Sequence, residues 1–374
     1  MNNYISRIRR PVKRKDAEQH VLLALLSFAA SVTLTRLFLQ LTGYPQIGNN
    51  ELHIAHVLWG GLLLFVAALS PLIFANRWVH PLGAVLGGVG VGLFIDEVGK
   101  FITQNNDYFY PAAAPIIYVF FLITVLVYLQ VRRPSARDAR AELYCALDLL
   151  AEVLDDDLDT RERAELEARL RPVAQQTDQR DEARLANVLL DFLASPDLHV
   201  IPHAPGFWER CLRQAQALEA RWVKRRRLKA ALTGAMGALG LLAVVKLSSL
   251  VVAAFSPAFL EQMVNELVAL GQVRSANGVG WFSARLALDG SVGLLLLVAA
   301  VLMIVGQERL GVQLSLLGLL LSLTVVDLLV FYFDQFSTIF TAMVQFGLLL
   351  GVLYYRRRYL AQTCVKLAST VSDR

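Results

Sequence analysis

The stretch PLGAVLGGVGVGLFIDEVGKFIT, residues 81–103, decides the fold of this chain. It is apolar and rich in glycine up to Ile95, and it then carries two acids and a lysine, Asp96, Glu97 and Lys100. A helix rises about 1.5 Å per residue, so this stretch can cross a hydrocarbon core of about 30 Å. Charged groups at that depth cost about 2.5–3.5 kcal/mol each on insertion scales and usually face a bundle interior. The stretch therefore predicts a transmembrane helix with a polar site toward one end.

Seven further apolar runs of similar length accompany this stretch. They lie at 20–42, 52–76, 112–131, 229–256, 282–306, 309–333 and 337–355. The chain of 374 residues is 56% hydrophobic and 18% charged, whereas soluble domains carry about 25% charged residues. We therefore expect an all-α membrane protein with eight transmembrane helices, embedded in a lipid bilayer.

Charge divides the chain into five segments. The region between the fourth and fifth runs is dense in Arg, Asp and Glu, and leucines recur there at helical spacing, as at Leu143, Leu147 and Leu150. We expect helices in this region near 136–155, 160–176, 181–194 and 206–227. The predicted segments are a basic arm at 1–19, a first membrane block at 20–133, a helical insert at 134–227, a second membrane block at 228–358 and a tail at 359–374.

The basic residues predict the orientation of the spans. Lys and Arg are frequent in the N-terminal arm, after the fourth span, before the fifth and after the eighth, while the loops at 43–50 and 103–111 carry neither. Loops rich in Lys and Arg stay in the cytoplasm. We therefore expect both termini and residues 134–227 to be cytoplasmic, in a chain that lies in the inner or plasma membrane of the cell. The net charge of +5 lies in these clusters, so it indicates helix orientation and argues against nucleic acid as a partner.

The two membrane blocks resemble each other in sequence. LLLFVAA at 62–68 matches LLLLVAA at 294–300, and at nearly the same offset Asp96 pairs with Asp327. Each block contains four spans and starts on the same predicted side. We therefore expect two four-helix repeats, an arrangement that is common in transporters and places sites near the repeat interface.

Ionisable residues gather in the half of the first block that the loop charges place outside. ELHIAH at 51–56 opens the second span and puts His53 and His56 on one helical face, since residues three apart are neighbours on a helix. The glycines of the third span let neighbouring helices approach closely. The candidates for a polar chamber are Arg36, Glu51, His53, His56, Asp96, Glu97, Lys100 and Asp107. Their counterparts in the second block are Lys246, Arg285, Asp289 and Asp327.

Three interpretations of these residues remain open. Imidazole and carboxylate suit zinc or iron, so His53, His56 and Glu97 could hold a metal ion, although the two nearby cations disfavour a divalent ion. The same acids and histidines could relay protons or ions. A purely structural role is the third interpretation, in which the acids of the third span neutralise Lys100 one turn on or Arg36 across the bundle.

Three functions agree with this pattern. The first is transport or permeation through an outward-facing polar chamber, with a small ion or an anionic solute as cargo. The second is an outer-leaflet membrane enzyme, metal-dependent in one version, that acts on a lipid-linked substrate. The third is a membrane scaffold or sensor that binds a cytoplasmic protein through residues 134–227. The sequence contains no Walker loop, Rossmann fingerprint or hydrolase elbow, which argues against ATP-driven transport by this chain alone.

Three short motifs resemble those of a group of bacterial multi-pass membrane proteins. They are ELHIAH at 51–56, GLFIDEVGKFIT at 92–103 and NDYFYPAA at 106–113. The likeness covers residues 50–130 best, and DQFSTI at 334–339 is similar too. The resemblance implies a membrane fold and a bacterial host, and it brings no activity, cofactor or catalytic residue.

Overall fold

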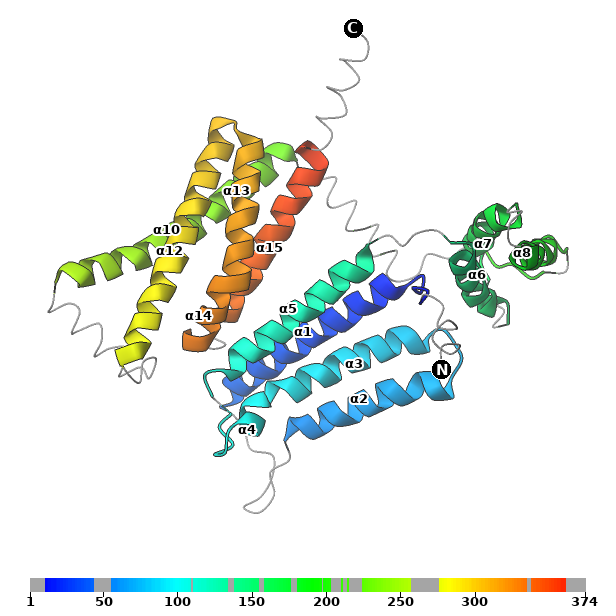
Figure 1. Ribbon diagram of the computed structural model, residues 1–374, viewed down its shortest axis with the longest axis horizontal. Helices are drawn as coiled ribbons and strands as arrows, with labels where there is room; N and C mark the ends of the chain where they lie inside the picture. Colours follow the sequence, from blue (N-terminus) through cyan, green and yellow to red (C-terminus); the bar gives the residue numbers. More distant parts are fainter. Residues whose placement is uncertain are drawn as a thin grey trace, which may run out of the picture. The chain divides into compact units, whose positions relative to one another are not determined.

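The structure is a computed structural model, and Figure 1 shows its helices. It describes residues 11–43, 55–108, 110–133, 138–154, 158–175, 180–196, 198–202, 210, 214, 224–256, 276–334 and 338–360. Within these residues the regular secondary structure is helical, apart from one isolated β-bridge between Asp159 and Ile201. Eight of the described helices are long and apolar enough to cross a membrane. The predicted all-α fold with eight spans is confirmed.

The apolar runs form helices whose limits lie close to those predicted. The helices of the first four runs are α1 (Ala17–Thr42), α2 (His56–Ile73), α3 (Val79–Asp96), α4 (Val98–Ile102) and α5 (Ala113–Arg132). Those of the last four are α10 (Arg225–Phe255), α12 (Ala276–Val305), α13 (Glu308–Leu321), α14 (Asp327–Asp334) and α15 (Ile339–Tyr355). Gly43 ends α1 in a left-handed conformation, and its N–H donates to the oxygen of Leu39, a common helix stop.

Two runs are not single continuous α-helices, which corrects the sequence-based expectation. The third run breaks at Glu97, between α3 and α4. The seventh contains a π-helical turn, Ser322–Val326, between α13 and α14. Both interruptions coincide with tertiary hydrogen bonds to freed carbonyl groups, which are described below. Hydropathy carries no information about such bonds, so it predicts only the length of each span.

The helices divide into two compact units. The first contains Met1–Asp96 and Ile123–Cys211, and the second contains Glu97–Leu122 and Leu212–Arg374. In the first unit α3 packs against both α1 and α2. In the second unit α12 packs against α10 and α13, and α15 packs against α13 and α10 (Figure 1). The helix that packs most extensively against two neighbours is thus the third span of the first block but the second span of the second block. The predicted four-helix repeat and the predicted domain limits stay predictions.

Glycines fix the contact between α2 and α3. A Cβ atom on Gly60 would lie 2.8 Å from the backbone oxygen of Gly90, so the two backbones touch there. Toward the other end of the contact, a Cβ atom on Gly83 would lie 3.6 Å from the oxygen of Ala67. Residue numbers rise along α3 as they fall along α2, so the two helices are antiparallel, as successive membrane spans must be.

The insert contains a small helical bundle of its own. Its helices α6 (Ala139–Leu154), α7 (Thr160–Ala174) and α8 (Arg180–Leu193) pack against one another. Asp159 accepts hydrogen bonds from the N–H groups of Arg161 and Glu162, and the Glu162 carboxylate accepts one from the N–H of Asp159. This reciprocal capping box starts α7. Three of the four predicted insert helices are confirmed. The fourth, at 206–227, lies almost wholly outside the described residues.

Candidate functional site

A ridge of small residues on α3 places the candidate acid Asp96 against α1. A Cβ atom on Gly88 would lie 2.3 Å from the backbone oxygen of Ala24, and one on Gly92 would lie 2.7 Å from the side chain of Ser31. The two contacts ascend both helices together, so α1 and α3 are parallel. Asp96 is the next residue of this ridge, because positions four apart share a helical face. The close backbone approach therefore carries Asp96 to the part of α1 that lies beyond Ser31.

Arg36 holds Asp96 through two hydrogen bonds. The Arg36 Nε–H donates to Asp96 Oδ1 at 2.5 Å, and Nη2 donates to the backbone oxygen of Asp96 at 2.9 Å. The second bond satisfies a carbonyl at the end of α3, where the helix breaks and intrahelical partners run out. Asp96 is 0% exposed and Arg36 is 6% exposed. This is a buried ion pair that also fixes the end of a transmembrane helix.

His56 completes the cluster from α2. Its Nε2 lies 3.1 Å from Asp96 Oδ2, the carboxylate oxygen that Arg36 Nε does not use. A carboxylate only accepts hydrogen bonds, so His56 donates through Nε2–H, either as one neutral tautomer or as the imidazolium. Gly60 lies one turn further along α2, and its contact with Gly90 brings this end of α2 close to α3. The His56 side chain is 24% exposed, so it is the most accessible member of the cluster.

The cluster combines a permanent and a variable positive charge on one carboxylate. Arg36 is always protonated, while imidazole is the side chain whose charge ordinarily changes between roughly pH 5 and 8. With neutral His56 the ion pair is balanced, and protonation of the ring adds one positive charge to a poorly hydrated site. The arrangement therefore places one carboxylate between a permanent cation and a side chain that can exist with or without a charge.

Glu97 and Lys100 form a separate ion pair in the second unit. Glu97 is 1% exposed, and its Oε2 lies 3.3 Å from the ammonium of Lys100. The same ammonium lies 5.2 Å from the centre of the Tyr108 ring. The backbone N–H of Asp107 donates to the Thr103 hydroxyl at 2.7 Å. The structural interpretation of the acids thus has direct support, since Asp96 lies against Arg36 and Glu97 against Lys100.

The metal interpretation stays a prediction. Among the residues that the structure describes, no group of three or more His, Cys, Asp or Glu side chains could hold a metal ion. Glu51 and His53 lie outside the described residues. The predicted ligand set of His53, His56 and Glu97 is therefore untested, as is the single polar chamber that would join all the first-block candidates.

The charged candidates of the second block are partnered differently. Arg285 on α12 forms an ion pair with Asp334 on α14. Its guanidinium carbon lies 5.4 Å from the ring centre of Phe282 and 5.9 Å from that of Phe333, distances at which cation–π attraction operates. Lys246 lies on an exposed face of α10. The predicted counterpart of Arg36 is therefore not buried.

Asp327 has neutral hydrogen-bonding neighbours. It is 4% exposed, and the Tyr118 hydroxyl lies 3.5 Å from its Oδ2 while donating to the backbone oxygen of Leu323 at 2.6 Å. The Gln345 amide, oriented with its nitrogen toward the carboxyl group, donates to Asp327 Oδ2 at 2.8 Å and accepts from the Ser322 hydroxyl at 3.1 Å. No ion pair involves Asp327 among the described residues. Half-buried Asp289 lies nearby on α12.

Sequence reasoning missed two of these residues. Tyr118 and Gln345 were not among the candidates, although Gln345 could have been found as a polar residue within an apolar run. The π-helical turn that frees the Leu323 carbonyl for Tyr118 has no signal in the sequence. Such turns recur at functional sites in other proteins, so this part of the second block deserves the same experimental scrutiny as the first.

The helices and their buried ion pairs define a multi-pass integral membrane protein. The chain matches no known family model, curated protein or solved structure. Any assignment of activity therefore rests on the residues themselves.

Proposed function

We propose that this protein is a membrane transporter or permeation protein that uses the Arg36–Asp96–His56 cluster to couple movement of an ion or anionic solute to proton uptake. One observation carries the proposal: a fully buried carboxylate lies between a permanent cation and a titratable imidazole, inside an apolar helix bundle. Ionisable groups in such positions commonly mark substrate or proton pathways.

The chemistry of the cluster supports coupling to a proton. Asp96 neutralises Arg36 when His56 is neutral, so the site holds no net charge. Protonation of His56 adds a charge that a low-dielectric interior solvates poorly. An anion that enters from water can neutralise it, and departure of the anion favours release of the proton. Proton and anion would thus bind and leave together.

The position of the cluster supports access from one side of the membrane. Asp96 is the last residue of α3, His56 is the first residue of α2, and Arg36 lies in the last third of α1. Because α1 and α3 are parallel and α2 is antiparallel, all three residues lie toward the same membrane face. The distribution of Lys and Arg supports an orientation in which this face is outside and both termini and the insert are in the cytoplasm.

Flux measurements on reconstituted protein test the proposal. Purified protein in liposomes that contain a pH-sensitive dye should acidify the interior when a proton gradient is imposed, faster when chloride or phosphate is supplied outside. Asp96→Asn and His56→Gln should abolish this flux, while His199→Gln, which alters an exposed histidine of the insert, should leave it unchanged. Absence of flux in the parent protein with every anion, or equal flux in Asp96→Asn, would reject the proposal.

A further inference from the structure

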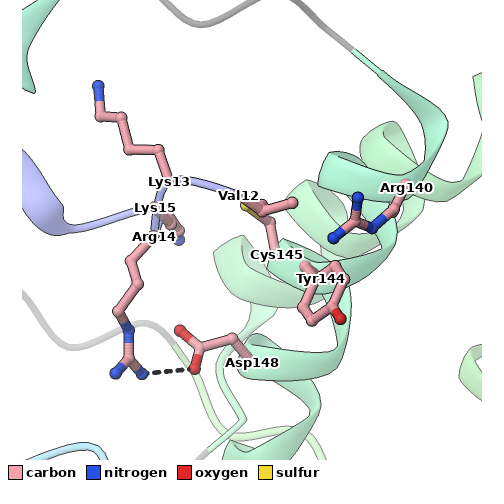
Figure 2. A pocket seen from close by; sticks show the side chains of 8 residues that line it. All are labelled: Val12, Lys13, Arg14, Lys15, Arg140, Tyr144, Cys145 and Asp148. Carbon is pink, nitrogen blue, oxygen red and sulfur yellow. Dashed lines mark hydrogen bonds and ion pairs between the residues drawn. The ribbon is translucent and has the colours of Figure 1, made fainter. Parts of the chain in front are cut away.

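A basic cavity lies where the N-terminal arm meets the insert. It has a volume of about 340 Å³. Figure 2 shows the side chains that line it, with arm residues on one side and residues of α6 on the other. The lining residues are Val12, Lys13, Arg14, Lys15, Arg140, Tyr144, Cys145 and Asp148. Four of them are cationic and one is anionic, so the cavity carries a strong positive charge.

Two of the four cations are paired with acids. Arg14 Nη2 lies 2.8 Å from Asp148 Oδ1, and Lys15 Nζ lies 2.8 Å from Glu165 Oε2. Burial raises the pKa of the Glu165 carboxyl, but hydrogen bonds from Lys15 and Arg169 outweigh this effect and leave its pKa below the ordinary value. Glu165 is therefore ionised at neutral pH and holds Lys15.

The other two cations lack an acidic partner within the described part of the chain. Lys13 Nζ donates to the backbone oxygen of Arg133 at 3.2 Å, and the Arg140 guanidinium lies over the ring of Tyr144 at 5.5 Å. Burial raises the pKa of the Cys145 thiol, so this residue stays neutral and adds no negative charge. Lys13 from the arm and Arg140 from α6 are therefore the two lining cations whose charge no acid balances among the described residues.

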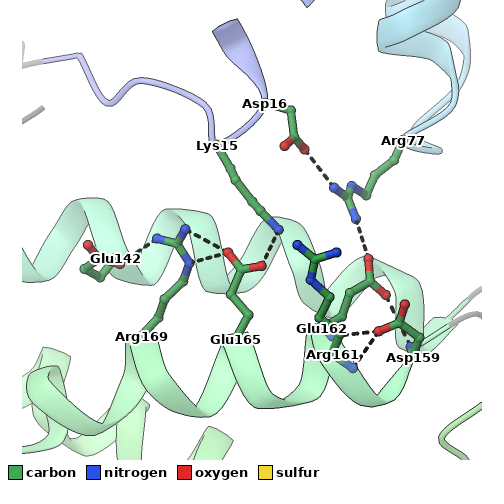
Figure 3. Close-up of polar contacts among 9 residues, drawn as sticks. All are labelled: Lys15, Asp16, Arg77, Glu142, Asp159, Arg161, Glu162, Glu165 and Arg169. Carbon is green, nitrogen blue, oxygen red and sulfur yellow. Dashed lines mark hydrogen bonds and ion pairs between the residues drawn. The ribbon is translucent and has the colours of Figure 1, made fainter. Parts of the chain in front are cut away.

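A set of ion pairs holds the arm against the insert and gives the cavity a defined shape. Figure 3 shows Lys15 bound to Glu165 on α7, and Arg77 bridging Asp16 of the arm and Glu162 at the start of α7. The Arg77–Asp16 distance is 3.0 Å and the Arg77–Glu162 distance is 3.8 Å. Lys15 and Asp16 of the arm are thus held by ion pairs, unlike the residues of a freely solvated tail.

We infer that this cavity binds a phosphate group carried by a small molecule or a lipid headgroup. Guanidinium groups match the oxygens of phosphate in a forked geometry, and a lysine adds a point charge. The volume lies at the lower end of the range of small-ligand pockets, which suits a phosphate with a few attached polar atoms. An incoming phosphate also competes with Asp148 for Arg14, so binding would loosen one contact between arm and insert.

The location favours a lipid headgroup as the source of the phosphate. The arm leads directly into α1 at Ala17, and Lys13 contacts the carbonyl of Arg133 immediately after α5 ends. Both neighbouring helices are membrane spans, so the cavity lies at the level of the lipid headgroups. Basic pockets at this level are recognised sites for anionic lipids.

Binding to the full-length protein tests the inference. Protein purified in a non-ionic detergent is titrated with inorganic phosphate and with glycerol phosphate, and affinity is read from the shift of thermal unfolding. In parallel, protein extracted from vesicles of phosphatidylglycerol and phosphatidylcholine is examined by native mass spectrometry for retained lipid. The test variant is Lys13→Gln with Arg140→Gln. The matched control is Arg171→Gln with Arg184→Gln, which removes the same charge from exposed positions on α7 and α8.

The outcomes separate the sources of phosphate. Retained phosphatidylglycerol that the test variant loses and the control keeps supports a lipid site. Binding of glycerol phosphate that weakens roughly tenfold in the test variant, without retained lipid, supports a soluble ligand. Variants are compared only after circular dichroism shows equal helix content. If neither phosphate nor phosphatidylglycerol binds, or if test and control variants bind alike, the inference is wrong.

Discussion

Neutralising one member of the Arg36–Asp96 pair should be far more harmful than neutralising both. Asp96 is 0% exposed and Arg36 is 6% exposed, so each single substitution leaves a buried charge without its partner. Loss of one partner of a buried pair costs about 3–5 kcal/mol, whereas replacement of the whole pair by neutral groups is often nearly neutral. Asp96→Asn should lie at the low end of this range, since an amide oxygen still accepts from Arg36.

The magnitude follows from a double-mutant cycle. Asp96→Asn and Arg36→Met should together sum to about 6–8 kcal/mol as single variants, while the double variant should stay within about 2 kcal/mol of the parent. The coupling free energy would then be about 4 kcal/mol or more, above the range for most neighbouring pairs.

Unfolding in mixed micelles measures these free energies. Helix content is followed by circular dichroism as the fraction of sodium dodecyl sulfate rises, and each free energy of unfolding is extrapolated to the starting micelle. The control is the same cycle on Arg171 and Glu167, a pair on the insert surface, where coupling should be about 0.3–0.5 kcal/mol. Additive effects of Asp96→Asn and Arg36→Met would refute the reasoning, because they would mean that the two charges do not depend on each other.

Three further predictions concern other parts of the chain. Gly88→Ala should destabilise the protein by about 1–3 kcal/mol, because its Cβ would lie 2.3 Å from a backbone oxygen of α1, whereas Gly87→Ala, with its nearest atom at 4.0 Å, should have little effect on the same unfolding assay. Glu165 stabilises the docked insert while its carboxyl group is ionised. The urea concentration at the midpoint of insert unfolding should therefore decrease as the pH is lowered below about 4.5, the ordinary pKa of this side chain. Glu165→Gln should weaken this pH dependence, and Asp191→Asn should not. If the insert is cytoplasmic, a membrane-impermeant maleimide should label Cys145 in inverted vesicles and not in intact cells, in a variant that keeps only this cysteine; the reverse pattern would invert the proposed topology.

Span positions could be predicted because the bilayer sets them. A run must be apolar over the thickness of the hydrocarbon core, and whether it is apolar depends only on the residues of the run itself. The limits of α1, α2 and α5 therefore lie within a few residues of the predicted ones. The break at Glu97 could not be predicted in this way, because Arg36, sixty residues earlier in the chain, satisfies the carbonyl that the break leaves free.

Part of the candidate site could also be predicted from the sequence. We expect an arginine in one apolar run to form an ion pair with an acid in another, and Arg36 and Asp96 form such a pair. The sequence did not predict which of the two adjacent acids would pair with Arg36, because Asp96 and Glu97 have different partners. Residue spacing on α3 decides it: Asp96 continues the ridge of Gly88 and Gly92 toward α1, and Glu97 does not.

The aligned aspartates Asp96 and Asp327 show why a repeat in sequence need not repeat a site. Asp96 meets a cation because α1 packs directly on α3. In the second unit α10 packs on α12 instead and Lys246 lies on an exposed face of α10, while the hydrogen-bonding neighbours of Asp327 are Tyr118 and Gln345. An aspartate that receives its hydrogen bonds from neutral groups can bind and release a proton without breaking an ion pair. The two aspartates therefore need different tests. Substitutions at Asp96 should change the charge of its ion pair with Arg36, whereas substitutions around Asp327 should remove its hydrogen bonds to Tyr118 and Gln345.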